Sequence, residues 1–207
     1  MANTDKPFGL RPVGNLSATG AQKSSGYQIA DNYGTSIFQG DLVALAGGFI
    51  VKFVAASQAT AIGVFNGCNY TDPTTGKYVW KNFYPASTNI TTGVITADVF
   101  DDPSQQFLIQ FDSTAMTQAM VGLNASITTS TTGSTTTGVS ASTLLGSSAA
   151  VTSTLALKIC GLLASPSNEL GAYAVAVVKI NTHQYGSVGV AVVRKVCFGN
   201  SVRTTST

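Results

Sequence analysis

The sequence has 207 residues, a length that favours one domain over a multidomain enzyme. Only 10% of the residues are Asp, Glu, Lys or Arg and 44% are apolar, which excludes a disordered chain because disorder goes with low hydrophobicity and high charge. The net charge is +2 and the basic residues are scattered, so no basic patch is available for a phosphate backbone and nucleic acid is excluded as a partner.

The first 25 residues form a polar segment that prolines and glycines interrupt, with neither helical nor strand periodicity. They predict an extended N-terminal arm over residues 1–25, followed by a β-rich domain over residues 26–207. The apolar side chains of the arm, Phe8, Leu10 and Val13, are expected to anchor it on a surface. The segment has no apolar run of signal-peptide length, so we expect no secretion by that route.

From Tyr27 onward, short segments rich in Val, Ile, Phe, Tyr and Thr alternate with turn residues, which is typical of an all-β domain. Gly47 and Gly48 predict a tight hairpin between two such segments, because glycine accepts positive φ without steric cost. The predicted strands cover residues 36–38, 42–45, 49–54, 61–65, 77–84, 94–100, 107–111, 155–163, 173–180 and 188–198.

Two segments depart from the strand pattern. Residues 112–123 predict one short helix, since Asp112 or Ser113 provides a cap and apolar residues recur at helical spacing. Residues 126–154 are dominated by Ser and Thr and carry no charge. We expect this tract to be an exposed insertion, rather than a β-rich segment ordered by contact with something else.

Residues that carry catalytic chemistry are scarce. His183 is the only imidazole, and no nucleophile elbow or cysteine-protease signature accompanies it, so we interpret it as a structural residue. Asp101 and Asp102 are adjacent and precede a proline, which indicates a turn rather than a pair of glycosidase carboxylates. Calcium-loop and phosphate-loop spacings are not found, so the sequence predicts no metal, no cofactor and no enzymatic activity.

The cysteine content and the hydropathy of the sequence indicate the redox state of the thiols and whether the chain spans a membrane. Cys68, Cys160 and Cys197 are an odd number in apolar, strand-like contexts, and we interpret them as buried reduced thiols rather than as a disulfide or metal site. No stretch approaches the roughly 20 apolar residues that span a bilayer, so the sequence predicts no membrane partner.

Five groups of short strings occur in one order along most of the chain and point to one family. They are Phe8-Gly9-Leu10-Arg11-Pro12-Val13-Gly14, Gly40-Asp41-Leu42-Val43, Gly63-Val64-Phe65 with Gly67-Cys68, Asp101-Asp102-Pro103, and Val178-Lys179-Ile180-Asn181 with His183-Gln184. They resemble the capsid decoration (cement) proteins of tailed bacteriophages. None of them is a catalytic motif.

The resemblance implies a β-barrel or jelly-roll-like body that forms a homo-oligomer, a trimer or a dimer, on the outer capsid surface of a virion, after synthesis in the host cytoplasm. It also implies that residues 1–14 bind the major capsid protein, so that deleting them abolishes capsid binding and leaves the fold intact. The anchors of this arm would be Phe8, Leu10, Arg11, Pro12 and Val13.

An alternative function rests on the aromatic residues Tyr78, Trp80 and Tyr84, which are compatible with a stacking face for sugars. Aromatic residues on strands more often pack in the core and across strands, and we favour that interpretation. The alternative is a carbohydrate-binding β-sandwich module of a phage tail or a cell surface.

Overall fold

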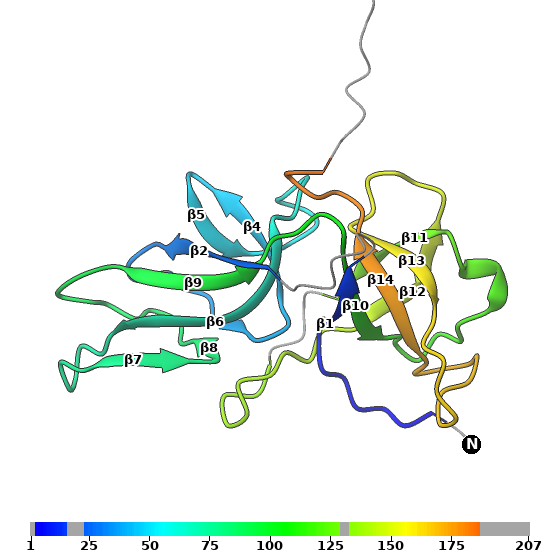
Figure 1. The fold of residues 1–207 in the computed structure, drawn as a ribbon, viewed down its shortest axis with the longest axis horizontal. Helices are drawn as coiled ribbons and strands as arrows, with labels where there is room; N and C mark the ends of the chain where they lie inside the picture. Colours follow the sequence, from blue (N-terminus) through cyan, green and yellow to red (C-terminus); the bar gives the residue numbers. More distant parts are fainter. Residues whose placement is uncertain (1–2, 16–22, 129–132, 187–207) are drawn as a thin grey trace, which may run out of the picture.

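The computed structural model describes residues 3–15, 23–128 and 133–186, and these residues form antiparallel β-sheets (Figure 1). The prediction of an all-β domain is confirmed. The strands are β1 (Arg11–Asn15), β2 (Ser24–Ile29), β3 (Ile37–Phe38), β4 (Leu42–Ala46), β5 (Phe49–Lys52), β6 (Gly63–Thr71), β7 (Tyr78–Lys81), β8 (Phe83–Tyr84), β9 (Ile95–Phe100), β10 (Gln105–Gln110), β11 (Asn124–Ile127), β12 (Leu144–Ala150), β13 (Leu157–Leu162) and β14 (Val175–Ile180).

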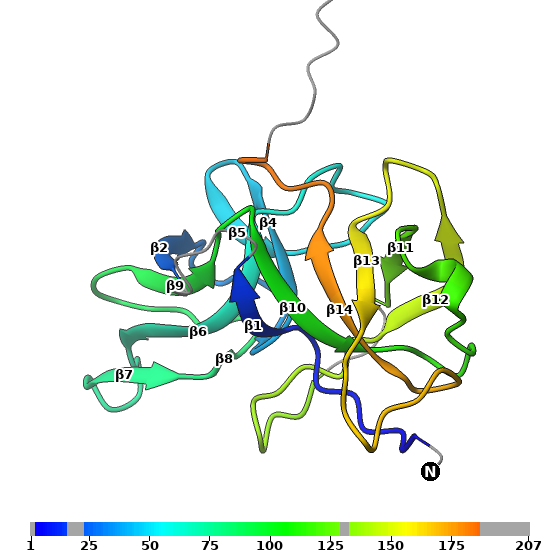
Figure 2. The ribbon, with the colours of Figure 1, turned by 45° about the vertical axis from the view of Figure 1, so that its right-hand side comes forward.

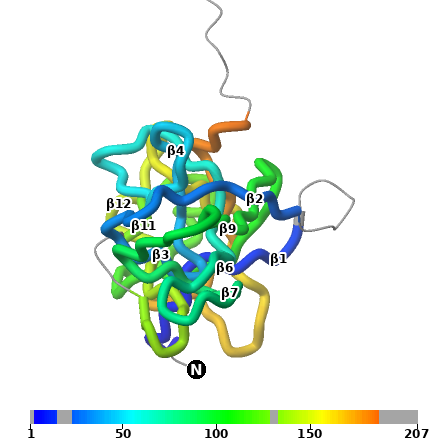
Figure 3. The backbone as a smooth tube through the Cα atoms, turned by 90° about the vertical axis from the view of Figure 1, so that its left-hand side faces the viewer, coloured from blue at the N-terminus to red at the C-terminus, as the bar shows by residue number. Residues whose placement is uncertain are grey.

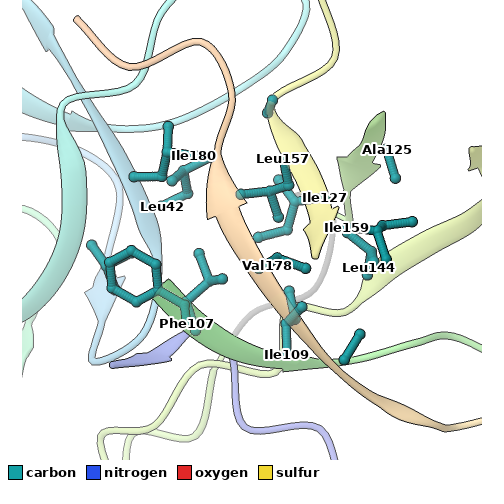
Figure 4. Close-up of a cluster of buried hydrophobic side chains, with 14 of the residues drawn as sticks. Leu42, Phe107, Ile109, Ala125, Ile127, Leu144, Leu157, Ile159, Val178 and Ile180 are labelled. Carbon is teal, nitrogen blue, oxygen red and sulfur yellow. The ribbon is translucent and has the colours of Figure 1, made fainter. Parts of the chain in front are cut away.

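The first sheet has the strand order β1-β10-β14-β13-β11-β12 and closes into a small barrel. A bridge between Phe111 and Leu144 joins the chain just after β10 to the start of β12, and the Asp112 N–H donates to the Leu144 carbonyl at 3.0 Å. Figure 4 shows the side chains of Ile109, Leu144, Ile159 and neighbouring residues gathered in the resulting core. The barrel-like body that the resemblance implies is therefore present in this half of the chain.

The second sheet has the strand order β2-β9-β6-β4-β5, and β7 pairs with the later part of β6. It curls so that its outer strands β2 and β5 approach each other. The two-stranded sheet β3–β8 packs against the enclosed interior through Ile37 and Tyr84. The remaining core residues of this interior are Ile29, Val43, Ile50, Ile62, Phe65, Cys68, Tyr70, Ile95, Ala97 and Val99.

Strand β4 connects the two halves, because successive residues of a strand point to opposite sides. Leu42 and Ala44 pack into the core of the first sheet, whereas Val43 lies in the interior of the second sheet. Figure 2 shows the two sheets side by side, with β4 and β5 beside the strands β10 and β14. Burial on both sides explains why β4 has an unbroken apolar sequence.

The predicted helix over residues 112–123 is wrong, since only Gln118–Met120 forms a 3₁₀ turn. Outside this short turn, backbone N–H groups of the segment donate to residues that are distant in the sequence. The Met116 N–H donates to Gly171 O at 2.8 Å and the Gly122 N–H donates to Ile159 O at 2.9 Å. The Asp112 carboxylate accepts from the Thr114 N–H at 2.9 Å, which forms a local turn rather than a helix cap.

The expected exposed insertion over residues 126–154 is also wrong, although residues 129–132 lie outside the described residues. Strand β12 lies in the first sheet, and Leu144 is fully buried. The hydroxyls of Ser140 and Ser142 are buried and donate to Asp41 Oδ1 at 2.6 and 3.3 Å. Lys52 completes this buried cluster at 3.2 Å from Asp41 Oδ2, so the Ser-rich tract is held by a carboxylate from the other half of the chain.

Most of the strand predictions are confirmed, and four observed strands were not predicted. Nine of the ten predicted segments overlap an observed strand, and Gly47 and Gly48 form the expected hairpin turn with φ of 58° and 87°. The segment predicted as one strand over residues 77–84 is two strands in different sheets, interrupted at Asn82. Strands β1, β2, β11 and β12 are not predicted, and the predicted strand 188–198 lies outside the described residues.

Candidate functional site

The N-terminal segment lies against the body of its own chain. The Asn3 side chain donates to Glu169 O at 2.9 Å, and the Lys6 N–H donates to Gln110 Oε1 at 2.9 Å. The Leu10 N–H donates to Gly40 O at 2.8 Å, and the Leu10 side chain is only 1% exposed in the core of the first sheet. Leu10 is thus a core residue of this fold and is not available as an anchor on another protein.

Four of the five predicted anchors line one cavity of about 430 Å³, which we call the arm hollow. Phe8 and Arg11 are stacked, with the guanidinium carbon 4.6 Å from the ring centroid. Val13 does not line the hollow and is 47% exposed. The residues of the hollow are Phe8, Leu10, Arg11, Pro12, Gln39, Gly40, Phe65, Asn66, Phe100 and Val139.

The close approach of the arm to the body depends on Gly9. Its φ of 69° lies in the left-handed region, and a Cβ at this position would lie 2.7 Å from both Gly40 O and the Ser140 Cβ. A residue with a side chain therefore conflicts with both the backbone conformation and the packing. The Gly9 within the string Phe8-Gly9-Leu10 is the sequence signal for this contact.

Strand β1 is the outermost strand of the first sheet. It pairs with β10 through Arg11 and Pro12, and the register shifts between Pro12 and Gly14, which leaves Val13 in a bulge. Within the described ranges, the other edge of β1 has no neighbouring strand. An open edge offers backbone groups to a strand of another chain, but Pro12 has no N–H to donate and the Gly14 carbonyl already accepts from the Gln105 side chain at 2.6 Å.

The outer face of the second sheet carries a second group of candidate residues, which we call the open face. Partners directly opposite in an antiparallel ladder point to the same side of a sheet. Trp80, Asn69, Thr96 and Gln28 form one row across β7, β6, β9 and β2, and Figure 3 looks along these strands from one end. The opposite side of these strands lines the buried interior. The open face comprises Gln28, Asn66, Asn69, Thr71, Tyr78, Trp80, Thr96 and Asp98.

Trp80 and Tyr78 are the two exposed aromatic residues of the open face, with 53% and 71% of their surface exposed. The six-membered ring of Trp80 lies over Gly67, where a Cβ would come within 2.8 Å of two ring carbons. Tyr84 does not join them: it is fully buried and donates its hydroxyl to Tyr33 O at 3.1 Å. The predicted stacking face is therefore wrong for Tyr84, whereas Tyr78 and Trp80 share one exposed face.

A chain of side-chain hydrogen bonds leads from the arm hollow to the open face. The Gln39 amide donates to Asn66 Oδ1 at 3.0 Å, and the Asn66 amide donates to Asp98 Oδ2 at 2.8 Å. The two surfaces are thus continuous, with neutral amides between them.

His183 and Asp101 come together at the junction of the two sheets. His183 is 2% exposed, and its Nδ1 accepts from the Tyr185 N–H at 3.0 Å while Nε2 has no hydrogen-bond partner. Burial lowers the pKa of His183, and the negative charges of Asp101 and Asp102 oppose this effect. The Tyr27 hydroxyl donates to Asp101 Oδ2 at 2.7 Å, and burial together with this carboxylate raises the pKa of Tyr27.

This cluster does not form a nucleophile with an accessible base. Tyr27 keeps its proton, and both the His183 ring and the Asp101 carboxylate are buried. Asp102 accepts from the Ser104 N–H at 2.7 Å and opens the turn into β10, as the sequence predicts. The arrangement fixes the end of β14 against β2 and β9.

The cysteines differ in their surroundings. Cys68 is buried as predicted, and burial raises the pKa of its thiol to about 12. Cys160, on β13, is exposed, so the prediction that it is buried is wrong. Both are free thiols, and Cys197 lies outside the described residues.

No family model, curated protein or solved structure matches the chain. In the described part of the chain, no three His, Cys, Asp or Glu side chains are grouped closely enough to hold a metal ion. None of the helical residues described forms a helix with the length and hydrophobicity to cross a bilayer. The arm hollow and the open face are therefore assessed on their geometry.

Proposed function

We propose that the chain is a virion structural protein that binds the outer surface of a phage capsid and bridges neighbouring copies of the major capsid protein. The observation that carries this proposal is the arm hollow at strand β1: Phe8, Arg11 and Pro12 line the hollow, and the edge of β1 away from β10 has no neighbouring strand among the described residues. The sequence resemblance assigns capsid binding to these same residues.

The position of Leu10 changes how the arm would act. Because Leu10 is part of the core, residues 3–15 cannot leave the body without exposing a buried leucine. The capsid protein would therefore bind to the arm in the position seen here. A strand of the capsid protein would pair with the free edge of β1, and an apolar side chain of the capsid protein would enter the arm hollow. Val13 and Arg11, both exposed, would lie at the centre of this interface.

Weak binding by one copy is sufficient if many copies act together. Interfaces of ordinary size bury about 800 Å² on each partner, and linked binding events raise the overall affinity without new contacts. A homo-oligomer, either a dimer or a trimer, would provide such linkage between capsid subunits. The low charge of the chain suits an interface whose centre must lose its water.

The experiment uses capsids of the phage that encodes the chain, prepared without it, and purified chain added back. Wild type is expected to sediment with the capsids. The variant Val13→Asp places a charge in the bulge of β1 and is expected to weaken binding at least about tenfold, the ratio that corresponds to 1.4 kcal/mol. Val151→Asp is the matched control, since Val151 is 85% exposed and lies after β12.

Failure of the wild-type chain to sediment with the capsids would refute the function itself. Equal binding by wild type and Val13→Asp would refute the role of β1 while leaving capsid binding in place. A loss of binding by the control Val151→Asp to the same extent would also refute it, because the effect would not then depend on β1.

A further inference from the structure

The open face has the composition of a saccharide-binding surface rather than of a protein core. Its eight residues include two exposed aromatic rings, three side-chain amides, two hydroxyls and one carboxylate. Flat aromatic faces stack on the C–H faces of sugar rings, and amides and carboxylates form paired hydrogen bonds with neighbouring hydroxyls. We propose that the open face binds a neutral glycan chain, with Trp80 as the stacking platform.

The position of Trp80 supports a fixed platform. Its ring occupies the space above Gly67, where any side chain would collide with it, and 53% of the residue remains exposed. One side of the ring system thus rests on the backbone of β6. Tyr78 follows two residues earlier on β7 and points to the same side, so two rings lie in line along one strand.

Polar side chains lie next to the rings. Asn69 lies directly opposite Trp80, and its Oδ1 is a buried acceptor with no hydrogen bond. The Asp98 carboxylate lies on the same face, and its Oδ2 accepts from the Asn66 amide at 2.8 Å. The two acceptors lie on adjacent strands, β6 and β9.

The charge of the open face selects the class of glycan. Asp98 is its one ionisable carboxylate, and the remaining polar groups are neutral amides and hydroxyls. A sulfated or uronic-acid chain would meet this carboxylate without a compensating cation among the eight residues, so a neutral chain fits best. The inference does not rest on capsid binding, because the stacking platform Trp80 lies outside both β1 and the arm hollow.

Trp80 is the only tryptophan of the chain, so its fluorescence reports directly on this face. The probes are cellohexaose, maltohexaose and chitohexaose, titrated into the full chain while emission is recorded and binding is measured by calorimetry. At least one hexasaccharide is expected to change the Trp80 emission saturably, with a dissociation constant of about 1 mM or below.

Two variants and a control complete the test. Trp80→Ala is expected to weaken calorimetric binding at least about tenfold, and Trp80→Phe, which keeps a ring, by less. Phe49→Ala, at an aromatic residue that is 40% exposed on the other edge strand β5, is expected to bind like wild type. Far-ultraviolet circular dichroism of each variant confirms that the fold is retained.

Three results would overturn the proposal. One is that none of the three hexasaccharides changes the Trp80 fluorescence or gives a heat of binding. Another is wild-type affinity in Trp80→Ala. A third is a wild-type oligomer that becomes monomeric in Trp80→Ala during analytical ultracentrifugation, because the open face would then be occupied by a second copy of the chain.

Discussion

Leu10→Ala tests whether the N-terminal segment is an integral part of the fold. Leu10 is 1% exposed and packs in the core of the first sheet together with Leu42 and Phe107. Replacing a buried leucine by alanine removes its transfer free energy and leaves a cavity, at a cost of about 2–5 kcal/mol. With a urea dependence of about 2 kcal/mol per M, the unfolding midpoint is expected to fall by about 1–2.5 M.

The assay is equilibrium unfolding in urea, followed by circular dichroism. Val13→Ala serves as the control, since Val13 is 47% exposed and its truncation is expected to change stability by no more than about 0.5 kcal/mol. The reasoning is refuted if Leu10→Ala unfolds at the same urea concentration as Val13→Ala. A free arm, with Leu10 in solvent, would give that result.

Two further predictions concern the backbone and the buried histidine. Gly9→Ala is expected to lower the free energy of unfolding, measured in urea, by more than Gly47→Ala does. Both residues have positive φ, but only Gly9 has atoms within 3 Å of the position that a Cβ would take. Equal losses of stability in the two variants would contradict the close contact at Gly9. The lowered pKa of His183 means that the unfolded chain takes up a proton before the folded chain does. Its contribution to stability is therefore present above the ordinary histidine pKa of about 6.5 and is lost as the pH falls below that value. The loss of stability between pH 7.5 and pH 5.5 should be smaller in His183→Gln, and an identical loss would show that His183 does not titrate in this way.

The sequence predicts local structure well where one strand and its turn decide the outcome. The hairpin at Gly47 and Gly48 follows from the conformational freedom of glycine, and the turn at Asp102 follows from its side chain. The identification of β4 as a buried strand depends only on its apolar run. These features depend on a few adjacent residues, so they can be inferred without the rest of the fold.

Features that depend on distant partners could not be predicted in this way. Residues 112–123 have helical spacing, but their N–H groups pair with Gly171 and Ile159, which lie far along the sequence. Ser140 and Ser142 are buried because Asp41 accepts their hydroxyl groups, and nothing near them in the sequence indicates that partner.

The candidate site was predicted in part. The arm residues are grouped as expected, but the burial of Leu10 depends on its packing against β4 and the first sheet. Tyr78 and Tyr84 have similar sequence contexts, yet the chain changes sheets between them, so one is exposed and the other is buried. The deletion of residues 1–14 is therefore expected to damage the fold, contrary to the expectation from the sequence, because it removes Leu10 and Gly9 from the core contacts.

The most direct test of the proposed function is the protein composition of purified virions. The phage that encodes this chain is grown and purified through a density gradient, and its proteins are quantified by mass spectrometry relative to the major capsid protein. We predict that the chain is present in a fixed ratio to the major capsid protein and that protease treatment of intact particles cleaves it. Its absence from the particles, with all of the chain remaining in the soluble lysate, would contradict the account.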